Sequence, residues 1–194
     1  MEISNTPIDG LKIIKLDKFS DNRGFFVERF SKNKFSEKGL PTNFVQDNHS
    51  RSKKGVIRGL HFQPNPAQGK MVGCINGRIW DVAVDIRPES KTCGQYFGIE
   101  LSSENATLLW IPTGFAHGFC VLGEDDADVS YKITSHYNPK GETGIAWNDP
   151  DINVKWPLDK MSFDKEPVTS IRDTEQQSFS DYMKSPLEWI EANE

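Results

Sequence analysis

A histidine accompanied by cations is the part of the sequence best suited to chemistry. His61 lies within residues 58–63 (RGLHFQ), which begin with Arg58 and are followed by Lys70. Histidine is the side chain whose unperturbed pKa, about 6.5, lets it take up a proton near neutral pH. We therefore interpret His61 as a general base that removes a proton from a carbon next to a ketone.

That reaction places two further demands on the sequence. The proton leaves only if the negative charge that moves onto the ketone oxygen is stabilised, and Lys70 offers a cation for this in a dry pocket. Inversion also needs an acid on the opposite face, a role that fits Tyr131 in residues 129–133 (VSYKI). Core packing of Tyr131, with its hydroxyl near a partner, is an equally good interpretation of that strand-like segment.

The remaining histidines divide into two groups. His117 lies between aromatic residues in 115–119 (FAHGF), as His61 does in its own segment. A buried histidine with satisfied hydrogen bonds is the alternative for both, and the neighbouring cations and acidic residues favour a functional role. His49 and His136 lie in polar, loop-like contexts, so we predict that both are solvated.

The spacing of possible ligands predicts neither a metal site nor a disulfide framework. All-β barrels often hold a metal through an H-x-H pair, but Gln63 stands two positions after the first strand histidine and Phe119 two after the second. The cysteines, Cys74, Cys93 and Cys120, are odd in number and scattered. We expect them to be packed as small apolar residues.

Composition favours a soluble globular protein with one domain over residues 1–194. Hydrophobic residues make up 36% and charged residues 26% of the 194, and no apolar run approaches the ~20 residues that span a bilayer. The formal net charge of −5 argues against a nucleic-acid binder, which needs a basic face. The first residues lack the basic region and apolar core of a signal peptide, so the cytoplasm is the expected location.

Short strand-like segments at roughly 8–12-residue spacing point to an all-β sandwich or barrel. Turn-forming residues separate these segments from one another. The clearest of them cover residues 96–101, 107–111, 117–122, 128–134 and 143–147.

Two strands around Asn76-Gly77 read as a β-hairpin with a type I′ turn, from 71–75 to 78–86. Alternation along the second strand puts Asp81 and Asp85 on one face, which we expect to line a cavity because buried carboxylates are costly. Helices are predicted over residues 32–38 and after Ser185-Pro186, where a capping serine precedes proline at the first helical position.

Nine blocks in order resemble the dTDP-4-dehydrorhamnose 3,5-epimerase family over roughly residues 8–180. The blocks are 21–26 (DNRGFF), 46–50 (QDNHS), 58–63 (RGLHFQ), 67–70 (AQGK), 81–85 (DVAVD), 110–112 (WIP), 114–119 (GFAHGF), 131–132 (YK) and 147–150 (WNDP). The resemblance implies a cupin-type jelly-roll with a core over about 8–157, an irregular or helical tail over 158–194, a homodimer, and no metal or cofactor. It implies conversion of dTDP-4-dehydro-6-deoxy-D-glucose into dTDP-4-dehydro-L-rhamnose in dTDP-L-rhamnose biosynthesis.

The same resemblance implies roles for individual residues. His61 is the proton acceptor, Tyr131 the proton donor, Asp173 the carboxylate that orients the base, and Lys70 the oxyanion stabiliser. Tyr137 stacks on the thymine. The other expected substrate contacts are Arg23, Glu28, Gln46, Asn48, Arg58, His117, Glu142 and Arg172.

The sequence departs from the family pattern at two positions. Gly73 stands where the family usually has arginine, and Arg172 where it commonly has lysine, which keeps the charge but not the geometry. Strict alternation would also put Arg58 and His61 on opposite faces of their strand. We therefore predict a bulge there, at Gly59, if both are to reach one ligand.

Several other functions fit the same residues. A monofunctional 3- or 5-epimerase and a ketoisomerase are alternatives on the same scaffold. Less favoured are a metal-dependent cupin enzyme and a module that binds a nucleotide sugar without chemistry.

Overall fold

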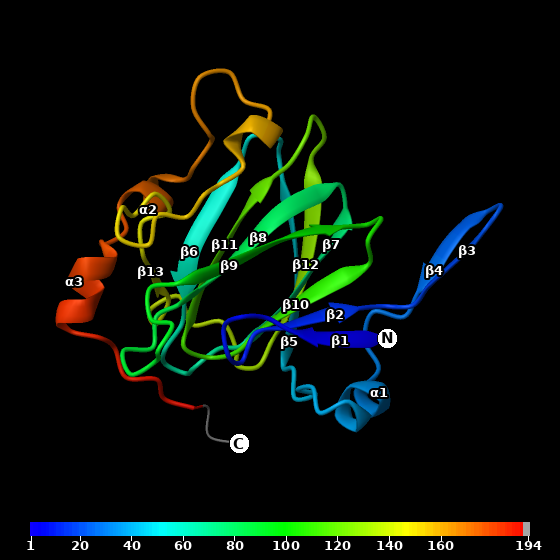
Figure 1. Ribbon diagram of the computed structural model, residues 1–194, viewed down its shortest axis with the longest axis horizontal. Coiled ribbons are helices and arrows are strands. Elements are labelled where there is room, and N and C mark those ends of the chain that lie inside the picture. The colour runs from blue at the N-terminus through cyan, green and yellow to red at the C-terminus, as the bar shows by residue number, and fades with distance from the viewer. Residues whose placement is uncertain (192–194) are drawn as a thin grey trace.

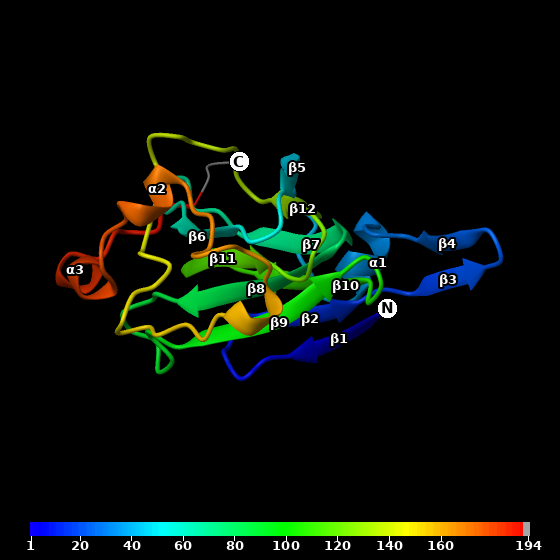
Figure 2. The same ribbon diagram turned by 90° about the horizontal axis from the view of Figure 1, so that it is seen from above.

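Two antiparallel sheets packed face to face form the body of the protein in the computed structural model, which describes residues 1–191 (Figures 1 and 2). The elements of the first sheet, in spatial order, are β1 (Glu2–Asn5), β2 (Lys12–Lys15), β10 (Thr107–Ile111), β7 (Lys70–Asn76), β12 (Ala127–Ile133) and β5 (Gln46–Ser52). Those of the second are β13 (Thr143–Gly144), β6 (Ile57–Phe62), β11 (Phe115–Val121), β8 (Arg78–Asp85) and β9 (Tyr96–Ser102). The predicted all-β class is confirmed.

Alternation along the strands gives each sheet an inner and an outer apolar face. Val72 and Val129 of the first sheet meet Ile79 and Ala83 of the second in the core between the sheets. The outer face of the second sheet is also apolar, and there Val82 packs with residues of the C-terminal tail. Both faces of β8 are buried, and its sequence (RIWDVAVD) places apolar side chains on each of them.

The predicted hairpin at Asn76-Gly77 is wrong. β7 pairs with β10 and β12, whereas β8 pairs with β11 and β9, so the turn carries the chain from one sheet to the other. Gly77 has φ +72°, and a Cβ there would lie 2.5 Å from the carbonyl oxygen of Asp126. The residues therefore specify a tight turn, but the choice of strand partner depends on packing far along the chain.

The C-terminal tail wraps over the second sheet through η1 (Leu158–Lys160), α2 (Ile171–Thr174) and α3 (Phe179–Lys184). The helix predicted after Ser185 is wrong within the described residues, because Ser185 is the C-cap of α3 and the chain beyond it is not helical. Ile190 exchanges backbone hydrogen bonds with the loop before β7, donating to Pro64 (2.9 Å) and accepting from Ala67 (2.6 Å). These contacts hold the end of the tail extended.

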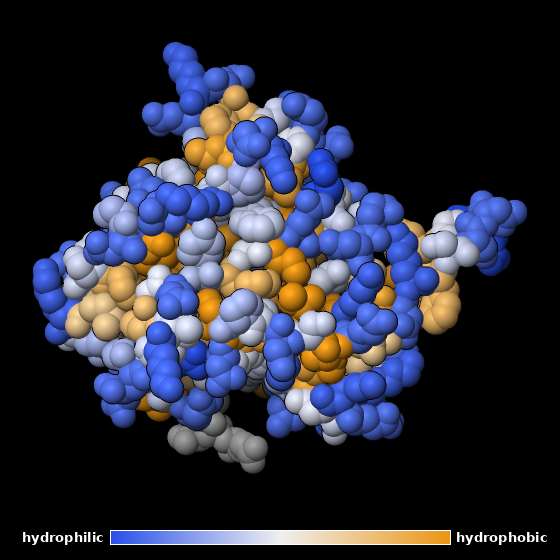
Figure 3. All heavy atoms as spheres, in the orientation of Figure 1, coloured by the Kyte–Doolittle hydropathy of each residue, from blue (hydrophilic) through white to orange (hydrophobic). Residues whose placement is uncertain are grey.

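A short helix and a protruding hairpin complete the structure. The predicted helix is present as α1 (Lys32–Glu37), which buries Phe35 against the outer face of the first sheet. β3 (Lys18–Asp21) and β4 (Gly24–Val27) form a hairpin that projects clear of the body (Figures 1 and 3). In the described part of the chain, no helix combines the length and apolarity needed to cross a membrane.

Candidate active site

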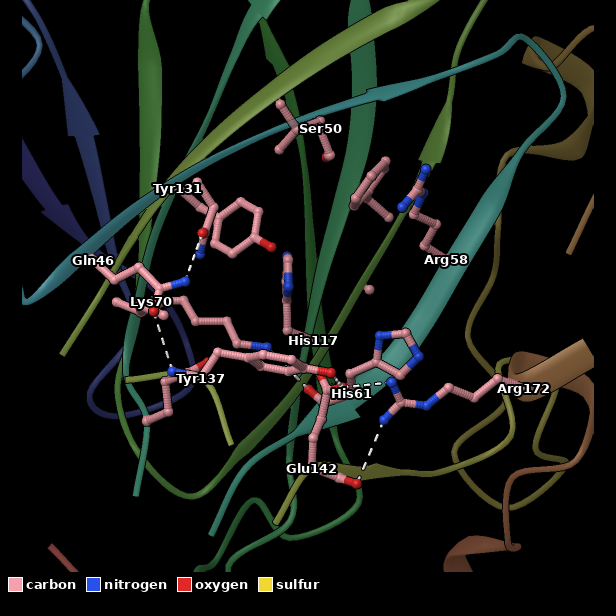
Figure 4. Close-up of a pocket in the computed structure, with 16 residues that line it drawn as sticks. Gln46, Ser50, Arg58, His61, Lys70, His117, Tyr131, Tyr137, Glu142 and Arg172 are labelled. Atoms are coloured by element: carbon pink, nitrogen blue, oxygen red, sulfur yellow. Dashed lines mark hydrogen bonds and ion pairs between the residues drawn. The ribbon is translucent and has the colours of Figure 1, made fainter. Parts of the chain in front are cut away.

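A cavity of about 300 Å³ opens between the two sheets and collects most of the predicted site residues (Figure 4). Side chains on the inner faces of both sheets line it, and the loop after β12 and the helix α2 close it from the side. The predicted residues that line it are Gln46, Asn48, Arg58, His61, Lys70, His117, Tyr131, Tyr137, Glu142 and Arg172.

His61 and Asp173 form the tightest polar contact of the site. Nε2 of His61 lies 2.5 Å from Oδ1 of Asp173, and the carboxylate is 3% exposed whereas the histidine side chain is 23% exposed. Burial raises the pKa of Asp173. The hydrogen bond from His61, the charge of His61 and the hydrogen bonds from Ser170 lower that pKa by more, so the net shift is downward. Asp173 is therefore held as a carboxylate behind the imidazole.

Backbone contacts explain how a residue so far along the chain reaches His61. Val168 forms a parallel bridge with Val56 at the start of β6, donating to the carbonyl of Gly55 (2.8 Å) and accepting from the amide of Ile57 (3.0 Å). Ser170 then caps α2 by accepting a hydrogen bond from the backbone amide of Asp173. These bonds deliver the carboxylate of α2 to the strand that carries the histidine.

The predicted bulge in β6 is confirmed. His61 is opposite His117 of β11, but Arg58 is opposite Phe119, so three steps on β6 match two on β11. Gly59 lies within this irregularity with φ +125°, a conformation that favours glycine. The extra residue brings Arg58 and His61 to the same cavity despite their spacing.

Lys70 is a buried cation at the floor of the cavity. It is 8% exposed, and Nζ donates a long hydrogen bond of 3.4 Å to the carbonyl of His61. Burial lowers the pKa of Lys70, the carboxylates of Glu142 and Asp81 oppose this, and the charge of Arg172 adds to the lowering. An ammonium placed here is poorly screened by water and interacts strongly with a developing oxyanion.

Tyr131 lies on the first sheet, across the cavity from His61, and Figure 4 shows its hydroxyl directed into the open space. The side chain is half-buried. Burial raises its pKa, and the negative charge of Glu142 raises it further. Tyr131 therefore stays in the protonated form that a proton donor requires.

A polar group at the side of the cavity joins the loop after β12 to α2. Oε2 of Glu142 accepts from the hydroxyl of Tyr137 (3.1 Å) and forms an ion pair with Arg172 (2.6 Å). The backbone amide of Tyr137 donates to the side chain of Gln46 (3.2 Å), which in turn donates to Asn48 (2.8 Å). The ring of Tyr137 is 47% exposed, which leaves it accessible as a stacking surface.

Two predicted site residues do not reach this cavity in their own chain. Arg23 stands at the tip of the β3–β4 hairpin with its side chain 85% exposed, paired with Asp21 (2.5 Å). Glu28 follows the hairpin and pairs with Lys34 of α1 (2.8 Å). Neither lines the cavity.

The carboxylates of β8 have separate surroundings. The prediction that both line a cavity is wrong, because both are fully buried and neither lines it. Asp85 accepts hydrogen bonds from Arg87, Ser90 and Thr92 in the following loop. Asp81 accepts a 2.8 Å hydrogen bond from Nε2 of His117, whose ring lines the cavity. Alternation in the sequence predicts Asp81 as an inward carboxylate but not its partner, because the two residues lie on different strands.

The departure at Gly73 lies outside the cavity. Gly73 faces outward from the first sheet, since its neighbour Val72 points into the core between the sheets. A Cβ on Gly73 would lie 2.3 Å from Nη2 of Arg29, so this guanidinium occupies the space above the glycine. Within residues 1–191, no three histidine, cysteine or acidic side chains gather into a group able to hold a metal ion.

Comparison with known proteins agrees with this geometry. The family model described as dTDP-4-dehydrorhamnose 3,5-epimerase matches residues 5–181. The Shigella flexneri enzyme of that name is 48% identical over 93% of this chain and 97% of its own length. The Neisseria gonorrhoeae protein of that name is 46% identical over 96% of this chain, which spans only 55% of that relative.

A solved structure extends the similarity to three dimensions. dTDP-6-deoxy-D-glucose-3,5-epimerase from Legionella pneumophila, crystallised in complex with dTDP-4-keto-L-rhamnose, superimposes with a TM-score of 0.88 at 43% identity. The alignment covers 98% of this chain and 99% of that one, so the predicted cupin-type jelly-roll is confirmed. Family model, relatives and fold agree, and the chain belongs to the dTDP-4-dehydrorhamnose 3,5-epimerase family.

Proposed function

We propose that this protein inverts C3 and C5 of dTDP-4-dehydro-6-deoxy-D-glucose to give dTDP-4-dehydro-L-rhamnose, a step of dTDP-L-rhamnose biosynthesis. The observation that carries the proposal is the pair of groups facing across the cavity, His61 with its buried carboxylate on one side and Tyr131 on the other. A base and an acid on opposite sides of a sugar ring meet the geometric requirement for inversion. Membership of the epimerase family supports the same reaction.

The steps follow from the positions of the protons. Asp173 accepts a hydrogen bond from Nε2 of His61, so Nδ1 is the nitrogen that takes the proton from the carbon next to the ketone. The C–H electrons move onto the C4 oxygen, beside the ammonium of Lys70, and Asp173 stabilises the imidazolium. Tyr131 then donates its proton to the opposite face of the carbon, and solvent restores both side chains.

The nucleoside diphosphate would lie along the polar side of the cavity. Arg58 and Arg172 offer planar guanidinium groups suited to bidentate contacts with phosphate. Tyr137 would stack on the thymine, and Gln46, Asn48, Glu142 and His117 would hydrogen-bond the sugar and nucleoside. The nucleotide-sugar complex of the Legionella pneumophila relative supports a ligand of this class.

We also infer a homodimer in the cytoplasm, with residues 1–194 acting as one jelly-roll domain. The β3–β4 hairpin exposes Phe19, Phe25 and Phe26 at 64%, 52% and 65%, a costly arrangement for a free arm. β5, the edge strand of the first sheet, carries cavity-lining residues. A hairpin from a second copy laid beside that edge would bring Arg23 and Glu28 to the partner's cavity.

Proton NMR in D₂O with purified protein and dTDP-4-dehydro-6-deoxy-D-glucose tests the proposed function. The expected result is loss of the C3 and C5 proton signals together with formation of the L-rhamno product. Exchange and inversion at one carbon alone would identify a monofunctional epimerase, and movement of the ketone a ketoisomerase. Substrate binding without deuterium incorporation would refute catalysis, and loss of activity to a chelator would refute a metal-free reaction.

A further inference from the structure

Two buried carboxylates of β8 have very different hydrogen-bond partners. Asp81 and Asp85 are both 0% exposed. Asp85 is saturated by a guanidinium and two hydroxyl groups of the loop that follows it. Asp81 accepts from His117, and its second oxygen, Oδ2, is fully buried without a hydrogen-bond partner among residues 1–191. A buried carboxylate with an unsatisfied oxygen is costly, which points to a role other than stability.

Asp81 fixes the direction in which His117 faces. His117 is the direct cross-strand neighbour of His61, so the two imidazoles lie side by side at the cavity. The contact with Asp81 engages Nε2, and Nδ1 is not among the buried side-chain atoms of residues 1–191 that lack a hydrogen-bond partner. Because the ring lines the cavity, Nδ1 is the atom that it presents to a ligand.

The charge of Asp81 also bears on the pKa of Lys70. Burial lowers the pKa of Lys70, and only two carboxylates, Glu142 and Asp81, act to raise it. Glu142 is already paired with Arg172 at 2.6 Å, and that arginine repels Lys70. Asp81 has no lysine or arginine partner of its own in residues 1–191, so its charge remains available to the ammonium. The other titratable groups around the cavity are His61, His117, Tyr131 and Tyr137.

We propose that Asp81 is a positioning residue for the epimerase reaction, holding Nδ1 of His117 toward the substrate. Asp81 does not touch the substrate and acts through this histidine. This inference rests on the proposed function.

The test compares Asp81→Asn with Asp85→Asn. Both changes remove a fully buried carboxylate from the same strand at constant shape, but only Asp81 contacts a residue that lines the cavity. We expect Asp81→Asn to lower kcat by at least about tenfold, and by less than the ~10²–10³-fold that loss of a direct oxyanion donor costs. The alkaline limb of its pH–kcat profile should also move to lower pH, because Lys70 loses its proton more easily without the opposite charge.

Binding of dTDP, measured by calorimetry, separates positioning from folding. Asp81→Asn should bind dTDP within about twofold of the wild type, because the phosphates are proposed to bind Arg58 and Arg172 and not His117. Asp85→Asn should keep the wild-type alkaline limb. Wild-type kcat and an unmoved limb in Asp81→Asn would overturn the inference, as would an equal shift in Asp85→Asn. Inactivity of the wild type would instead count against the proposed function.

A measurement on the unmodified protein covers the case in which Asp81→Asn does not fold. Nitrogen-15 NMR of the histidine rings, assigned with His117→Asn, reports which ring nitrogen of His117 carries the proton. A proton on Nε2 with Nδ1 free supports the inference, and a neutral ring with its proton on Nδ1 overturns it.

Discussion

Replacing Asp173 with asparagine tests the assignment of the base most directly. The carboxylate is 3% exposed and lies 2.5 Å from Nε2 of His61. A carboxylate can only accept, so it fixes a proton on Nε2 and leaves the lone pair on Nδ1 for the substrate. An amide of the same shape can donate instead, which reverses the tautomer and removes the charge that stabilises the imidazolium.

The expected loss can be bounded from these two effects. A carboxylate-to-amide change behind a catalytic histidine costs about 10⁴-fold in serine protease triads, where the tautomer is likewise reversed. General-base catalysis contributes about 10²–10⁴-fold, so we expect kcat of Asp173→Asn to fall within that range. At ~1.4 kcal/mol for each tenfold change, the barrier rises by about 2.8–5.6 kcal/mol.

The assay is the rate at which deuterium from D₂O replaces the C3 and C5 protons of the substrate. Asp149→Asn provides a matched control, because Asp149 is also 3% exposed but accepts only from backbone amides, those of Asp151, Ile152 and Phe179. That control should lose stability and keep the exchange rate. Exchange by Asp173→Asn within threefold of the wild type, with dTDP binding intact, would refute the assigned role of the His61–Asp173 pair.

Three further predictions follow from the described contacts. Tyr131→Phe should retain deuterium exchange while net inversion, measured by NMR of the product, falls about 10²-fold, because only the proton donor is lost. Equal loss of exchange and inversion would contradict the donor role. Burial raises the pKa of Asp85, but hydrogen bonds from Arg87, Ser90 and Thr92 lower it by more, so the net shift is downward. The stabilisation that this carboxylate gives to the folded protein is therefore complete above its unfolded pKa of about 3.9 and is lost on acidification. Urea unfolding should therefore show Asp85→Asn about 3 kcal/mol less stable at pH 7, a difference that shrinks below about pH 4; a pH-independent difference would contradict this account. Phe26→Asp at the exposed hairpin should give a monomer in analytical ultracentrifugation and weaken dTDP binding, and an unchanged dimer would exclude the hairpin as the interface.

Local patterns in the sequence predicted much of the fold and singled out Arg58, His61, Lys70, His117 and Tyr131 among the residues that line the cavity. Alternating residues gave the strands, as at Val129 and Ile133 on either side of Tyr131, because side-chain direction in a strand is set by residue parity alone. Gly59 indicated the bulge that brings Arg58 to the side of His61, since a glycine in a strand tolerates backbone that other residues do not. The roles of Asp173, Glu142 and Arg172 came from family resemblance and not from any local pattern.

Tertiary structure decided what depends on contacts far apart in the chain. Asn76-Gly77 fixes a turn, but the partners of the two strands are chosen by core packing, so the turn joins two sheets. Asp81 and Asp85 are equivalent by alternation, and only the fold places His117 against one and a loop arginine against the other. The sequence by itself determined which side chains face inward, because that depends on each residue's immediate neighbours. The fold decided which of them meet, because hydrogen bonds and charges act through space between residues that the chain order keeps apart.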